Sequence, residues 1–147
     1  MSRGFVLPSQ ISPPIVAAAS AVSAQGSSYV ATNQSTSSTS FVGLATAQTV
    51  TLTTGTAALV FVSCYGSNSA GGGQNFIMSF AVSGATTIAA TPYAAVADET
   101  TANFIQSLGA VVPVVLNAGS NTFTAQFRVG GGTGTFGLRT IAVLAVS

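Results

Sequence analysis

The chain has 147 residues, enough for one domain with a hydrophobic core. It carries five charged side chains, Arg3, Asp98, Glu99, Arg128 and Arg139, where a typical domain of this length has about 35. Without His or Lys it lacks the commonest general bases and every imidazole metal ligand, and three Arg cannot neutralise a row of phosphates. We therefore expect no enzyme, no cofactor, no metal and no nucleic-acid partner.

Residues 1–26 predict an extended N-terminal arm, because they combine prolines and small residues without a helix or strand period. The apolar residues of this arm are expected to form an interface by docking on a neighbouring subunit; they are Phe5, Val6, Leu7, Ile11, Ile15 and Val16. Residues 15–24 could also be a secretory signal cleaved after Ala24, which would fit a secreted adhesin. Pro8, Pro13 and Pro14 argue against the helix that a signal needs. No run of 18 apolar residues predicts a membrane span.

Residues 27–147 predict a single β-domain of short strands separated by Gly, Asn, Ser and Thr. The segment 122–129 alternates most clearly, with Phe123, Ala125, Phe127 and Val129 on one face. The run 57–65 is apolar on both faces, which indicates a central strand, and Pro113 within 110–116 indicates an edge strand. Further strands are expected at 49–53, 75–83, 86–91 and 135–147, with loops at 66–74 and 92–108 and a turn at 117–121.

The fold class predicted from this pattern is all-β: an antiparallel β-sandwich, jelly-roll-like, with the N-terminal arm extended from it. Its surface has few charges to prevent self-association. Either the 38 Ser and Thr side chains cover it, or partner subunits do, and we expect both.

Few residues are candidates for chemistry. Asp98 and Glu99 are neighbours, so they predict a solvated loop or an intersubunit ion pair, with a weak Ca²⁺ site as the alternative. Gly132, Gly134 and Gly137 match G-x-G-x-x-G, but a strand pattern follows them, and they predict a hairpin loop. Cys64 lies in an apolar run and is expected to be a buried, inert thiol.

Arg128 and Arg139 lie on predicted strands. Each is expected either to point outward and keep the sheet soluble, or to form a polar contact with another subunit. The three tyrosines, Tyr29, Tyr65 and Tyr93, could form a sugar-binding platform, but their separation in the chain favours packing roles.

Three segments, 49–63, 76–87 and above all 116–146, resemble a family of small structural proteins of tailed bacteriophages. In those relatives an "aGsnTft" segment and a terminal "R-x-I-x-V" strand close a jelly roll. The matching residues here are Gly119, Asn121, Thr122 and Phe123 in the first motif, and Arg139, Ile141 and Val143 in the second. Phe127 stands where the relatives tend to have Tyr.

The resemblance implies a virion structural protein: a head decoration or cement protein on the outer surface of the capsid. It further implies a homotrimer whose other partner is the major capsid protein. Such a protein stabilises the head by burying surface between capsid subunits. The alternative is a tail-fibre or baseplate module that binds a host glycan through loops such as 66–74 and 92–103.

Overall fold

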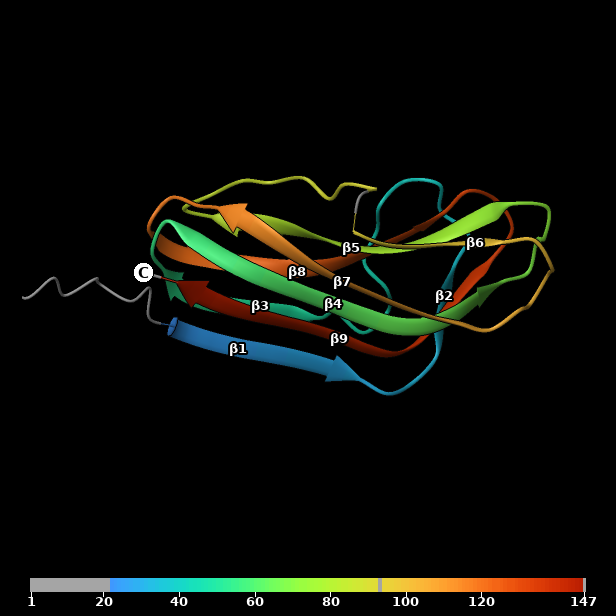
Figure 1. Ribbon diagram of the computed structural model, residues 1–147, viewed down its shortest axis with the longest axis horizontal. Coiled ribbons are helices and arrows are strands. Elements are labelled where there is room, and N and C mark those ends of the chain that lie inside the picture. Colours follow the sequence, from blue (N-terminus) through green and yellow to red (C-terminus); the bar gives the residue numbers. More distant parts are fainter. Residues whose placement is uncertain (1–21, 93, 147) are drawn as a thin grey trace, which may run out of the picture.

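The computed structural model describes residues 22–92 and 94–146, which form two layers of antiparallel strands (Figure 1). Nine strands make up this part of the chain: β1 (Val22–Val30), β2 (Gln34–Thr36), β3 (Thr49–Thr54), β4 (Ala57–Asn68), β5 (Gln74–Gly84), β6 (Ala95–Glu99), β7 (Gln106–Val115), β8 (Gly119–Val129) and β9 (Gly134–Val146). No helix among these residues is long and apolar enough to cross a membrane.

The strand order identifies the fold as a jelly roll. One sheet has the order β1-β9-β4-β7, with the short β2 also paired to β9, and the other has the order β3-β8-β5-β6. When β2 is set aside, eight strands remain, and they pair from the two ends of the chain inward: β1 with β9, β3 with β8, β4 with β7 and β5 with β6. Successive pairs lie alternately in the first and the second sheet. That alternation is a long antiparallel hairpin wrapped into two sheets, so the predicted β-sandwich is confirmed.

The core lies between the sheets and is built by period-two alternation. Along β8, Phe123, Ala125, Phe127 and Val129 point inward and are buried, as the sequence pattern predicts. Phe136 from the opposite sheet meets Phe127 edge-on, with ring centroids 4.9 Å apart. Aromatic pairs in this geometry stabilise a core beyond the area that they bury.

The N-terminal boundary of the domain differs from the predicted one by five residues. Strand β1 begins at Val22, so residues 22–26, placed in the arm by sequence, belong to the sheet. The small polar side chains here give no clear alternation, because β1 is held by main-chain pairing with β9 at the edge of the sheet. The predicted arm residues 1–21 lie outside the described residues.

Three further expectations are corrected by the structure. Residues 86–91 form no strand; Ile88 makes one isolated bridge to Val82. A strand that the sequence did not indicate, β6, lies in the expected loop 92–108, and loop 66–74 shrinks to 69–73 because β4 and β5 extend into it. The glycine-rich stretch 130–133 is no hairpin loop, since β8 and β9 lie in different sheets and the chain crosses between them.

Candidate interaction surface

The outward side of the β1-β9-β4-β7 sheet carries apolar residues in aligned rows. Strand register places Val146, Ala57 and Val115 in the first row, Leu144, Leu59 and Pro113 in the second, and Ala142, Phe61 and Val111 in the third. These nine residues are called the apolar face below. Their inward-pointing neighbours, such as Val60 and Val143, fill the core, so the face is the opposite side of the same three strands.

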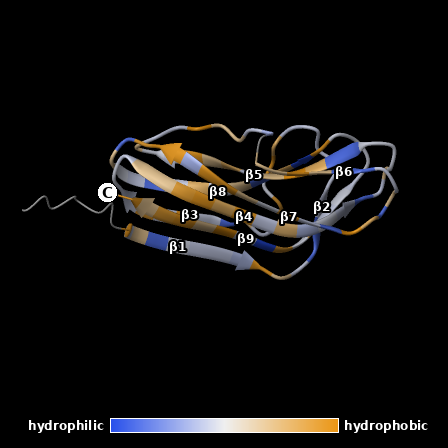
Figure 2. Ribbon diagram, viewed as in Figure 1, coloured by the Kyte–Doolittle hydropathy of each residue, from blue (hydrophilic) through white to orange (hydrophobic). Residues whose placement is uncertain are grey.

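The apolar face is open to solvent at its β7 edge. Val115 is 82% exposed and Val111 55% exposed, while Leu59, Phe61 and Leu144 on the inner strands are half-buried by their neighbours. Figure 2 shows hydrophobic colouring on β4, β7 and β9 toward the end where β9 stops. At a strand spacing of about 4.8 Å and a rise of about 3.4 Å per residue, the nine residues cover about 300 Å². The largest exposed apolar patch of a typical monomer covers about 300–600 Å² and is often functional, which makes this face a candidate interaction surface.

The face ends where polar residues begin. The next row along the same strands consists of Thr140, Ser63 and Gly109, with Tyr29 on β1. Beyond it the Tyr65 hydroxyl donates to Asn33 Oδ1 at 2.6 Å, so that tyrosine is occupied within the chain. On β4, β7 and β9 the outward side is therefore apolar toward the end of β9 and mainly hydroxyl-rich farther along, with Leu138, 51% exposed, as an apolar exception.

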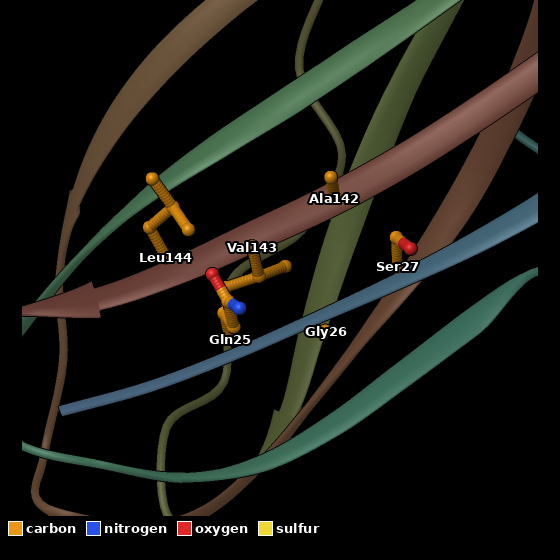
Figure 3. Close-up of a pocket in the computed structure, with 6 residues that line it drawn as sticks. All are labelled: Gln25, Gly26, Ser27, Ala142, Val143 and Leu144. Atoms are coloured by element: carbon orange, nitrogen blue, oxygen red, sulfur yellow. The ribbon is translucent and has the colours of Figure 1, made fainter. Parts of the chain in front are cut away.

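A hollow of about 390 Å³ adjoins the apolar face along the pairing of β1 with β9 (Figure 3). It is lined by Gln25, Gly26 and Ser27 of β1 and by Ala142, Val143 and Leu144 of β9. Gly26 faces the opposite sheet, where Val50 and Leu52 lie, so the small outward side chains at the hollow are those of Ser27 and Ala142. The hollow has room for a large side chain from another segment.

The apolar runs 57–65 and 110–116 were the sequence signal for this face. Apolar residues on both sides of a strand predict burial on both sides, and β4 is indeed a central strand. The sequence predicted a central strand at 57–65 and an edge strand at 110–116, both confirmed, without indicating that one side of them is left uncovered by the second sheet. In the described part of the chain only the inward side is covered by the second sheet.

Arg139 is fully buried, so the prediction of an outward-facing strand charge is wrong for this residue. Its position on β9 points inward, where Nη2 donates to Gln34 Oε1 at 3.0 Å and the guanidinium lies 5.5 Å from the Phe127 ring centroid. Nε and Nη1 have no hydrogen-bond partner among the described residues. Burial lowers the pKa of Arg139, the nearby Cys64 opposing that effect. Arg139 thus acts inside the subunit.

Arg128 lies on the other sheet, on the outward side of β8. Its guanidinium lies over the Phe41 ring, 5.3 Å from the centroid, and its Nε is buried without a partner. The side chain is partly exposed. A polar contact of Arg128 with another subunit remains a prediction, and it would lie away from the apolar face.

Glu99 is buried, contrary to the solvated position expected for it, whereas Asp98 is exposed. Glu99 Oε1 accepts the Asn68 main-chain N–H at 2.7 Å, and Asn68 Nδ2 donates to Asn75 O at 3.1 Å and Gly131 O at 2.9 Å. The Glu99 side chain thus links β6 to the end of β4, where loops 69–73, 100–105 and 130–133 meet, while its Oε2 has no hydrogen-bond partner among the described residues. The described residues contain no cluster of three or more potential metal ligands from His, Cys, Asp and Glu.

Cys64 is buried and unpaired, as predicted. Burial raises the pKa of its thiol to about 12, and the positive charge of Arg139 opposes the shift. Only the thiolate is a strong nucleophile, so the thiol is inert at neutral pH. Of the tyrosines, Tyr29 is exposed and Tyr65 half-buried, and Tyr93 lies outside the described residues, as do the six predicted interface residues of the arm.

Comparison with known proteins finds similar solved structures. The chain is similar to Eiger, a TNF from S. frugiperda, with a TM-score of 0.45 and 11% identity over 81% of this chain and 93% of that chain. No family model matches the sequence, and no curated protein matches it either.

Proposed function

We propose that the protein is a virion structural subunit, a capsid decoration or cement protein that stabilises the head by burying surface between capsid subunits. The observation that carries the proposal is the apolar face, nine aligned apolar residues without a charge on three neighbouring strands. Because the chain has only five charged side chains, charge repulsion does little to prevent two such faces from associating in solution.

The mechanism requires no chemical step. A subunit that binds assembled capsid proteins and not dissociated ones shifts the equilibrium toward the shell by mass action. Contacts of this kind are made by apolar cores and hydroxyl-rich rims, both of which the β1-β9-β4-β7 sheet offers. A nearly neutral surface is suited to this role, because association by apolar burial is not screened by salt.

The phage assignment, the homotrimer and the major capsid protein as partner depend on the sequence resemblance described above. Arg139 of that motif is buried and its Nη2 donates to the Gln34 side chain on β2, so the motif has a role in folding. A motif with a role in folding would suit any jelly roll of this type. The proposed location on the outer surface of the capsid therefore depends on the resemblance as a whole.

Native mass spectrometry of the full chain, from nanomolar to micromolar, tests the assembly. Quantitative proteomics of purified heads and tails, from a phage that encodes the chain, tests the location. The expected results are a closed oligomer, a trimer by the proposal, and copies in the head fraction. A monomer at every concentration, or copies confined to tails, would contradict the proposal.

A second candidate, a tail-fibre or baseplate module that binds a host glycan, is favoured by one observation. The loops after β4 and β6 lie side by side, since Gly72 N–H donates to Thr100 O at 3.2 Å and Asn103 N–H to Asn68 O at 2.8 Å. Phe104 beside them is 61% exposed, and aromatic rings of this kind can stack on sugars. Binding of the full chain to a glycan array, lost in Phe104→Ala, would favour this function over the first.

A further inference from the structure

The apolar face is too small to hold a stable assembly by itself. Its area of about 300 Å² is less than half of the 800 Å² or so that one partner contributes to a standard interface. An assembly of copies of this chain therefore needs further contact area. The hollow beside the face shows that the surface is not flat, so a second sheet laid on it would leave space unfilled.

Residues 1–21 have the composition to supply the missing contact area. Within them, residues 5–16 contain six large apolar side chains and no charge, a composition that matches a face without charges. A segment of 12 residues, from 5 to 16, spans up to about 40 Å when extended, which exceeds the width of a four-stranded sheet, about 15 Å. It can therefore cross the whole apolar face and place a large side chain in the hollow.

The strand register shows where this segment joins the sheet. Val22, the first residue of β1, pairs with Val146, which pairs with Ala57, which pairs with Val115. The row closest to the segment is thus a row of the apolar face. However, β1 runs from this row toward the polar half, so the chain enters β1 from beyond the end of the sheet. Covering its own face would require a reversal within residues 17–21, AAASA, which include neither Gly nor Pro.

We propose that residues 1–21 of one copy lie across the apolar face of a neighbouring copy, with a large apolar side chain in the hollow between β1 and β9. This inference rests on the proposed function, because it names the contact through which copies of this chain assemble with one another. The face carries no charge and residues 1–21 carry one charged side chain, Arg3, so the contact should depend little on salt.

Disulfide trapping in full-length chains tests the contact. With Cys64→Ala as background, unlabelled Leu7→Cys chains are mixed with isotope-labelled Val115→Cys chains and oxidised mildly. The heterodisulfide is then quantified by mass spectrometry. The control replaces Val115→Cys by Val96→Cys, which lies on β6 in the other sheet and is 43% exposed. We expect a heterodisulfide with position 115 at several times the yield found with position 96.

Three results separate this inference from the proposed function. Equal yields at positions 115 and 96 in a protein that assembles would overturn the inference and leave the proposed function standing. So would a disulfide formed only within one chain when Leu7→Cys and Val115→Cys are combined, because the segment would then cover its own face. A full chain that is monomeric by native mass at every concentration would overturn both.

Discussion

Substitution of Arg139 distinguishes a role inside the subunit from a role between subunits. Arg139→Ala removes a fully buried long side chain, and large-to-small changes in cores cost about 2 to 5 kcal/mol. Arg139→Met keeps the unbranched stem. It loses the hydrogen bond to Gln34 Oε1, a charged contact of about 1.5 to 3 kcal/mol, and the contact with the Phe127 ring, about 0.5 to 2 kcal/mol.

The Met variant also gains a term of opposite sign. The guanidinium is out of water with two nitrogens unpartnered, and desolvating such an ion costs several kcal/mol. The two contributions nearly cancel, so we expect the unfolding free energy to change by less than about 1.5 kcal/mol in Arg139→Met and to fall by about 3 kcal/mol in Arg139→Ala.

Urea denaturation followed by far-UV circular dichroism measures both variants against the parent chain. Native mass is recorded alongside, and it should stay unchanged in Arg139→Met because the side chain does not reach the surface. If Arg139→Met is destabilised as much as Arg139→Ala, the charge itself stabilises the fold and the reasoning about desolvation fails. A change in native mass would instead favour the contact between Arg139 and another subunit that the sequence suggested.

Three further predictions concern folding and the buried thiol. Gly66→Ala should cost more than about 2 kcal/mol by urea denaturation, because a Cβ there would overlap the Thr135 carbonyl oxygen and lie 2.9 Å from the Phe76 ring. The control, Gly43→Ala, has open space around it and should cost less than about 1 kcal/mol. Equal costs for the two variants would contradict the packing around Gly66. Asn68→Ala should cost about 3 kcal/mol in the same assay, since it leaves two partly buried carbonyls, those of Asn75 and Gly131, without their donor. A cost below about 1 kcal/mol would mean that water replaces the amide. Cys64 should resist iodoacetamide at pH 8 until the chain unfolds. Since its folded pKa of about 12 exceeds the unfolded 9.0, stability should fall as pH rises from 9 to 12, and Cys64→Ser should lack that slope; rapid alkylation of the folded chain would refute burial.

The sequence was sufficient to predict the sandwich because alternation in β8 is strict and apolar runs mark β4, β5, β7 and β9. It was insufficient at β1 and β6, where edge strands of small or polar residues are held by main-chain pairing that side-chain patterns do not record. The segment 86–91 shows the opposite error. Its Thr and Ile favour a strand, yet only Ile88 finds a partner.

The candidate surface was predicted in part. Low charge indicated that much of the outside is covered, and this argument did not depend on any strand. It could not say where, because an apolar residue on either side of a central strand looks the same in the sequence. Nor could it place Arg139 and Glu99 inside, since burial of a charge depends on partners from distant segments, such as Gln34 and Asn68.

The central claim is that the apolar face is where subunits meet. Sedimentation velocity of Val111→Asp and Val115→Asp, across a range of concentrations, tests it most directly, with Val96→Asp on the other sheet as the matched control. Both positions are solvent-exposed in the isolated chain, so the variants should fold normally, yet a carboxylate buried at a contact weakens association by about 2 to 5 kcal/mol. We expect both variants to dissociate at concentrations where the parent chain and Val96→Asp stay assembled. Assembly of all four proteins with the same affinity would contradict the account.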